Sequence, residues 1–317
     1  MTMRIGVLNN LRAGKRDSGV EQVLAFLRSN PDLLHIETDR DATLPEALAE
    51  FEREGVEVLV LNGGDGTIQH ALTHLFGGES TWRPRLAPIR GGRTNMTAID
   101  LGVRREARAG LAALVEALRA GRERECEVTR AVLRVEWPGH VRYAMFVGYG
   151  MLYRAVAFTH RAFPEGRAQG VFGAGIVTGA LIVRAALGAA RGVLTPDKMR
   201  VACDGADEPP REYLLVMATT LERLFLRLRP FWGRERAPVR VTTVETHARR
   251  IWRAAPGVML GRPAAYAVPE NGYRSRNVNE LVIQLDGGLV LDGELFDPQP
   301  DCVVRVTAVE GVRFLRA

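Results

Sequence analysis

The run Leu-Val-Leu-Asn-Gly-Gly-Asp-Gly-Thr at residues 59–67 constrains the fold of this chain more than any other stretch. Its apolar start is typical of a strand covered on both faces of a parallel sheet. Gly63, Gly64 and Gly66 then allow the chain to reverse with backbone angles that other residues resist, and let the main chain approach a ligand closely. A helix starting after this turn would direct unpaired N–H groups and its positive dipole end at a phosphate. Asp65 would repel that phosphate unless a cation or a hydroxyl proton lay between them, which suggests Mg²⁺ or a nucleophile.

A plain strand-to-helix turn is the alternative interpretation of the same residues. Other phosphate-binding motifs do not fit this chain. Gly14-Lys15 is followed by Arg16 instead of serine or threonine, and residues 173–179 miss the dinucleotide-binding spacing by one residue. Residues 59–67 are therefore the strongest candidate for a phosphate cradle.

Strands and helices alternate up to about residue 121, which predicts a mostly parallel sheet with helices on both faces. The expected strands are Ile5–Leu8, Leu34–Glu37, Val56–Leu61 and Leu86–Ile89, and the expected helices are Val20–Ser29, Leu44–Glu54 and Ala107–Ala120. After residue 125 the segments become short, β-rich and separated by turns, as in an antiparallel sandwich. These segments are Val128–Trp137, Arg142–Gly148, Met199–Cys203, Tyr213–Ala218, Val239–Thr243, Leu281–Leu285 and Val303–Val309. We therefore expect an α/β domain over residues 1–125 and a β-sandwich domain over residues 126–317, with the last strand able to pack back on the first domain.

The turn residues Asp286-Gly287-Gly288 lie between two apolar runs and predict a β-hairpin there. A chain of 317 residues is long enough for the two domains. Its three cysteines have no metal-binding or disulfide spacing, which favours a reducing, cytoplasmic setting. The amino terminus carries no apolar leader, so we expect that the protein is not exported.

The formal net charge is +6, and every basic residue except Lys15 and Lys198 is arginine. Arginine pairs well with phosphate, so we expect anionic partners. Nucleic-acid-binding signatures are missing, and an anionic membrane surface is the better candidate.

Two segments are candidates for membrane contact. Val171–Val183 is apolar but too short to span a bilayer, so it is either a buried helix or an interfacial one. Within residues 221–232, leucines alternate from Leu224 to Leu228 with Phe225, Arg227 and Arg229 on the other face, which predicts a strand with a basic outer face or a lipid-contacting surface.

The motifs together resemble the diacylglycerol kinase-like lipid kinases, which include bacterial diacylglycerol kinases and the sphingosine and ceramide kinases. The GGDGT run at residues 63–67 resembles their nucleotide loop. Asn10 to Lys15 resembles the N-P-x-[SA]-G-K loop of the family, and Thr38 stands where the family has a nucleotide-contacting threonine. Residues 91–102 and residues 290–294 resemble its G-G-T-x-N and V-x-D-G-E motifs.

The resemblance implies an α/β nucleotide-binding domain, three-layered around a mostly parallel sheet, followed by a β-sandwich domain for the lipid substrate. It implies ATP and Mg²⁺ as cofactors and nucleotide contacts by Asn10, Thr38, Gly63, Gly64, Asp65, Gly66, Thr67, Gly92, Thr94 and Asn95. By resemblance Glu294 is the proton acceptor, with Asp292 beside it, and Asp65 orients the waters of the metal or the acceptor hydroxyl. Because Asp292 and Glu294 lie two residues apart, an extended segment would point them to the same side.

Three functions remain open at this stage. The first is an ATP-dependent lipid kinase that acts on diacylglycerol or on a sphingoid or ceramide-type lipid, at a membrane surface. The second is a soluble NAD kinase-like enzyme, which would share GGDGT. The third is a non-catalytic lipid or nucleotide binder, because Arg93 stands where the family has threonine and the acidic metal loop of the family has no clear match. The pair His70 and His74 lacks a third ligand, so no protein-held metal is predicted, and a homodimer is left open.

Overall fold

A computed structural model describes residues 3–11, 19–38, 43–78, 80–92, 94–162, 195–206 and 208–316. The chain divides into two compact units, residues 1–131 with 310–317 and residues 132–309. The first unit thus extends six residues beyond the expected boundary at 125, and the last eight residues of the chain belong to it.

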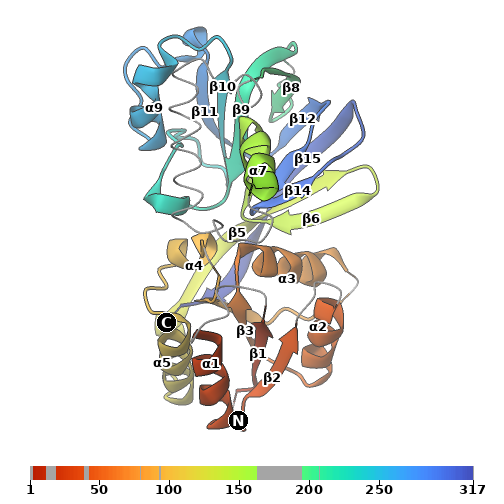
Figure 1. Cartoon of the computed structure of the whole chain (residues 1–317), viewed down its shortest axis with the longest axis vertical. Coiled ribbons are helices and arrows are strands. Elements are labelled where there is room, and N and C mark those ends of the chain that lie inside the picture. Colours follow the sequence, from red (N-terminus) through yellow and green to blue (C-terminus); the bar gives the residue numbers. More distant parts are fainter. Residues whose placement is uncertain are drawn as a thin grey trace. The chain divides into compact units, whose positions relative to one another are not determined.

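The first unit is a parallel sheet with helices on both faces. Its strands run in the order β4 (Arg85–Arg90), β3 (Val58–Gly63), β1 (Ile5–Asn10), β2 (Leu34–Thr38), and Phe314 near the end of β15 (Cys302–Leu315) pairs in parallel with Leu86 of β4. The helices are α1 (Gly19–Arg28), α2 (Leu44–Arg53), α3 (Asp65–Gly77), α4 (Met96–Asp100), α5 (Ala107–Arg119) and α6 (Glu123–Cys126). Helices α1 and α5 cover one face of the sheet, and α2 packs with α3 (Figure 1). The predicted α/β architecture is confirmed, and each predicted strand and helix of this unit ends within two residues of its expected limits.

The second unit is rich in antiparallel strands, as predicted. Its path runs β14 (Glu294–Phe296), β13 (Leu289–Leu291), β7 (Phe146–Gly150), β9 (Arg211–Thr219), β8 (Asp197–Cys203), β12 (Leu281–Leu285), β15. Strand β10 (Val239–Glu245) pairs with β9 and with β11 (Tyr273–Val278), and β5 (Glu127–Trp137) pairs with β6 (His140–Ala144) and β15. The other elements among the described residues of this unit are α7 (Met151–Ala162), α9 (Ile251–Met259) and the short turns Phe225–Arg227 and Pro269–Asn271. Apolar side chains of the strands form a core that includes Val147, Tyr149, Val216 and Ile283.

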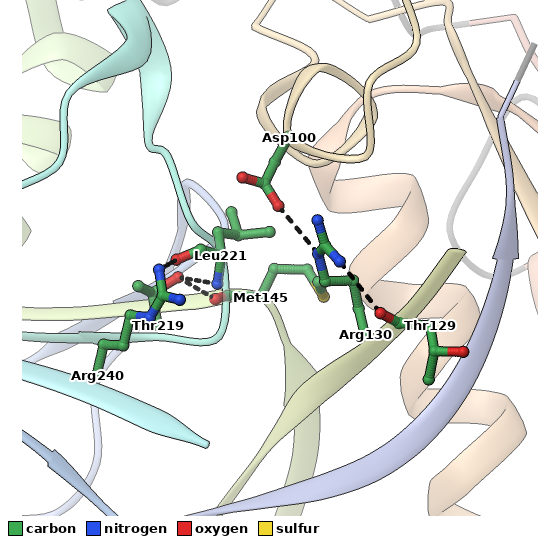
Figure 2. A network of polar contacts seen from close by, with 7 residues as sticks. All are labelled: Asp100, Thr129, Arg130, Met145, Thr219, Leu221 and Arg240. Atoms are coloured by element: carbon green, nitrogen blue, oxygen red, sulfur yellow. Dashed lines mark hydrogen bonds and ion pairs between the residues drawn. The ribbon is translucent and has the colours of Figure 1, made fainter. Parts of the chain in front are cut away.

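The segment Arg142–Gly148, expected as one strand, is two strands separated by Met145. The N–H of Met145 donates to Asp292 Oδ2 at 2.9 Å. The carbonyl of Met145 accepts the Thr219 hydroxyl at 2.7 Å (Figure 2). The next N–H, of Phe146, donates to Asp292 Oδ1 at 2.9 Å. Side chains from distant parts of the unit thus take the backbone groups that a continuous strand would have paired with its neighbours.

The hairpin expected at Asp286-Gly287-Gly288 is wrong, because β12 pairs with β8 and β15, whereas β13 pairs with β7 and β14. The hairpin lies one strand later. Strands β13 and β14 are joined by Asp292-Gly293, whose φ angles of +47° and +97° fit the left-handed turn that Asp-Gly favours.

The period-two strand expected across residues 224–228 is also wrong. Residues Phe225–Arg227 form a 3₁₀ turn, and Leu226 and Arg227 take φ angles of +55° and +58°. The apolar segment Val171–Val183 lies outside the described residues. Within the described ranges, no helix combines the length and apolar character needed to cross a membrane.

We predict that Asp292→Asn lowers the free energy of unfolding by about 1–3 kcal/mol. The amide would turn an N–H donor toward one of the two backbone donors, although asparagine tolerates the left-handed backbone of this turn. Chemical denaturation followed by circular dichroism measures the loss. Asp301→Asn is the matched control, because Asp301 also has a positive φ but is exposed, and it should change stability by less than about 0.5 kcal/mol. Equal losses in both variants would contradict a specific role for the Asp292 carboxylate.

Candidate functional site

Buried asparagines mark the carboxyl ends of the central strands β1 and β3. Asn9 and Asn62 lie opposite each other in the parallel register, and Asn62 Nδ2 donates to Asn9 Oδ1 at 2.5 Å. Asn9 Nδ2 and Asn62 Oδ1 are buried without a hydrogen-bond partner among the described residues. In open α/β sheets, ligands bind at this end of the strands. Sequence reasoning missed Asn9 and Asn62, although an asparagine directly after each of two apolar runs was the available signal.

The predicted glycine loop connects β3 to α3, as expected. The steric reason for its glycines differs from the expected one. Gly64 is extended, with φ −91° and ψ −176°, and Gly63 and Gly66 do not have positive φ angles either. Glycine is required at Gly63 because a Cβ there would lie 2.5 Å from Thr67 Oγ1. Close packing, and not left-handed backbone, therefore selects glycine at this position.

A second glycine loop, Gly91-Gly92, follows β4 and contacts the first loop through its backbone. A Cβ on Gly92 would lie 2.3 Å from Gly64 Cα, and a Cβ on Gly91 would lie 2.0 Å from Asn62 Oδ1. Asn95 closes this second loop: Gly92 N–H donates to Asn95 Oδ1 at 2.8 Å, and Asn95 Nδ2 donates to the Gly92 carbonyl at 2.7 Å.

Asp65 joins the two loops. Its buried carboxylate accepts the N–H of Met96 at 3.0 Å and the N–H of Thr97 at 2.9 Å, at the start of α4. Burial raises the pKa of the Asp65 carboxyl, while the hydrogen bonds from Thr97 and Met96 act to lower it. The protein's own carboxylate thus occupies the anion-binding end of α4.

The amino terminus of α3, by contrast, has no side-chain cap. The first hydrogen bond within this helix runs from Ile68 N–H to the Gly64 carbonyl, so the N–H groups of Gly66 and Thr67 have no acceptor inside the helix. Such an end of a helix of thirteen residues is suited to bind phosphate.

The other predicted nucleotide contacts lie at neighbouring strand ends. Asn10 Nδ2 donates to Thr67 Oγ1 at 2.8 Å, which ties the end of β1 to the glycine loop. Thr38 is buried at the end of β2, in register with Asn10. Thr94 is half-buried between Gly92 and Asn95, and Arg93 lies outside the described residues. The structure therefore brings together the predicted residues of the first unit.

The far end of α4 is held by an ion pair. Asp100, whose side chain is almost fully buried, lies 3.5 Å from Arg130 Nε on β5 (Figure 2). Helix α4 is thereby fixed by Asp65 at its start and by Arg130 at its end, and it keeps the second glycine loop against the first.

The two predicted catalytic residues of the second unit, Asp292 and Glu294, do not lie on one extended segment. The reason for expecting their side chains on the same side therefore does not apply. Asp292 is in the left-handed hairpin turn, and its carboxylate is directed at the N–H groups of Met145 and Phe146. Glu294 is the first residue of β14 and is half-buried. The structure thus gives the Asp292 carboxylate a positioning contact with the backbone of Met145 and Phe146.

Parts of this chain are similar in sequence or fold to known proteins. Residues 4–131 match the diacylglycerol kinase catalytic domain. A candidate diacylglycerol kinase from Bacillus anthracis strain Sterne is 17% identical, with a TM-score of 0.71 over 99% of this chain and 95% of that chain. A diacylglycerol kinase structure from the same strain is also 17% identical, with a TM-score of 0.63 over 99% and 97% of the two chains.

An NAD kinase from Archaeoglobus fulgidus in complex with ATP is 11% identical, with a TM-score of 0.49 over 99% of this chain and 94% of that chain. No curated protein matches the sequence. The two similar structures from Bacillus anthracis show that the fold is shared over nearly the whole chain, and the family match covers residues 4–131.

Proposed function

We propose that this protein is an ATP-dependent lipid kinase that transfers the γ-phosphoryl group of ATP to a hydroxyl of a lipid such as diacylglycerol or a sphingoid or ceramide-type lipid. The observation that carries the proposal is the pair of glycine loops in backbone contact beside the uncapped amino terminus of α3. Phosphoryl transfer requires mainly that the protein position the phosphates and stabilise their charge, and this arrangement can do both. The cytoplasmic face of a membrane is the place where such an enzyme would meet its lipid.

The residues of the first unit fit a nucleotide. The N–H groups of Gly66 and Thr67 would donate to phosphate oxygens, and Asn10 holds the Thr67 side chain in place. Asp65 already accepts two backbone N–H groups, which offset its charge beside the phosphates. In this proposal it orients waters of the metal or the acceptor hydroxyl.

Mg²⁺ would enter with ATP and neutralise charge on the phosphates. Within the described ranges, no three His, Cys, Asp or Glu side chains gather as a site for a metal held by the protein alone would need. In this proposal the metal is bound mainly by nucleotide oxygens.

Glu294 is the proposed general base for the lipid hydroxyl, and Asp292 is proposed to position it by fixing the β13–β14 turn. We predict that Glu294→Gln lowers kcat by about 10²–10⁴-fold, with little change in the KM for ATP or in thermal stability. Lipid phosphorylation from labelled ATP measures kcat, and thermal melting measures stability. Asp292→Asn is the matched variant, which should lower the melting temperature where Glu294→Gln does not. If both variants keep near-normal kcat on a confirmed lipid, the proton goes elsewhere, and Asp65 is the remaining candidate.

The two glycine loops provide a second prediction. Gly64→Val should abolish ATP binding, because its side chain would enter the space between the loops. Gly64→Ala should fold normally, since its Cβ would lie 3.6 Å from Gly92 Cα and its backbone suits any residue. Gly92→Ala should instead cost about 1–3 kcal/mol of stability, because its Cβ would overlap Gly64. Calorimetry with ATP and thermal melting separate the two effects, and wild-type affinity in a folded Gly64→Val protein would show that the cradle is assigned wrongly.

One assay separates the three candidate functions. The protein is incubated with labelled ATP and Mg²⁺, first with a lipid extract and then with NAD. Label in the lipid fraction supports the proposal, and label on NAD supports the soluble kinase. ATP or lipid binding without any transfer supports a non-catalytic binder.

A further inference from the structure

The surface of helix α9 is inverted relative to an ordinary amphipathic helix. Its small residues Ala254 and Val258 are buried, whereas Trp252 and Leu260 are 43% and 59% exposed. Trp252, Pro256 and Leu260 recur every fourth residue, so they form one stripe that is turned away from the core. Large apolar side chains grouped on one exposed face mark a candidate interaction surface.

A second exposed leucine is held next to the end of this helix. The N–H of Arg229 donates to the Met259 carbonyl at 2.9 Å, and a Cβ on Gly261 would lie 2.5 Å from the Arg229 carbonyl oxygen. The turn just before this contact carries Leu226, which is 57% exposed. Of the six large hydrophobic residues that are exposed among the described residues, Leu226, Trp252 and Leu260 belong to this region.

The backbone of the turn holds Leu226 outward in a costly conformation. Leu226 and Arg227 both have left-handed φ angles, which leucine and arginine rarely adopt. The turn is bracketed by a hydrogen bond from Leu224 N–H to the Leu228 carbonyl at 2.8 Å, and Thr242 Oγ1 donates to the Pro230 carbonyl at 2.6 Å. The exposure of Leu226 is thus built into the fold, and we infer that it serves an interaction.

The same region is strongly basic. Arg227, Arg229, Arg253 and Arg262 are exposed and make no ion pair with any residue that the structure describes. Between Glu245 and Glu270 the sequence contains four arginines and no acidic residue. The charge of this face would therefore attract an anionic partner.

We propose that this surface, called here the α9 face and made of α9, Leu260 to Arg262 and the turn at residues 225–229, docks on an anionic lipid bilayer. Leucine and tryptophan side chains are stabilised in an apolar medium, and arginine pairs with phosphate. The boundary between acyl chains and headgroups offers both environments at one depth. A second copy of this chain would bring arginines against arginines. A polyanion such as nucleic acid would leave the leucines in water. The inference does not depend on the proposed activity, because the test below uses binding alone.

The charge component is tested by sedimentation of the full chain with phosphatidylcholine vesicles, with and without phosphatidylglycerol. Wild-type protein should bind the anionic vesicles more strongly and lose this preference at high salt. Each arginine removed should weaken binding about fivefold, so Arg253→Gln/Arg262→Gln should lose about 25-fold. Arg105→Gln/Arg108→Gln, which changes exposed arginines of the first unit, is the matched control and should bind like wild type. Equal binding of wild type to both vesicles, or equal losses in both double variants, would overturn the proposal.

The apolar component is tested by tryptophan fluorescence. Anionic vesicles should shift the emission to the blue, and the shift should vanish in Trp252→Phe but persist in Trp82→Phe. Both changes keep an aromatic ring, and circular dichroism checks the fold. A shift that persists without Trp252 would exclude this face. So would a dimer in analytical ultracentrifugation that Leu260→Asp dissociates, or binding of heparin without binding of vesicles.

Discussion

A buried carboxylate that accepts two consecutive backbone N–H groups fixes each unit of this protein. Asp65 holds the first turn of α4, and Asp292 holds the break between β6 and β7. Buried charges and buried N–H groups are both costly alone, and here each satisfies the other. In both cases the aspartate is followed by glycine and binds a segment that is distant in sequence. Two short loops thereby become rigid without a long helix or strand of their own.

The contact of Asp65 also bears on where the proposed phosphate site lies. Two helices start beside the glycine loops, and both amino termini would attract an anion. Asp65 occupies the end of α4, and α3 begins with no side-chain cap. Because Arg130 holds the other end of α4, this helix acts as a brace for the second glycine loop. We therefore assign the proposed phosphate contacts to the first loop, at the start of α3.

Local sequence determined much of this architecture and the position of the glycine loops, because strand and helix periodicity and glycine spacing are local properties. The errors concern partners that are remote in sequence. The break at Met145 depends on an aspartate 147 residues away, and no local pattern marks it. Asp286-Gly287 and Asp292-Gly293 carry the same turn residues, yet only the second closes a hairpin, since the neighbours of β12 are β8 and β15. The buried amides of Asn9 and Asn62 were missed for a related reason, because burial of a polar side chain depends on the whole sheet.

The α9 face is another feature that local sequence does not predict. The sequence of α9 carries a regular apolar period, and periodicity alone would assign Trp252 and Leu260 to the core because they are the largest apolar residues. The fold instead buries Ala254 and Val258 and leaves Trp252 and Leu260 exposed. The segment after the helix approaches Arg229 so closely that a Cβ on Gly261 would lie 2.5 Å from the Arg229 carbonyl oxygen. Which apolar residues of α9 are buried thus depends on the partners that the fold brings to the helix, and local periodicity does not contain that information. In our proposal, the arginines of the α9 face make its apolar stripe suited to an anionic membrane surface rather than to another copy of the chain.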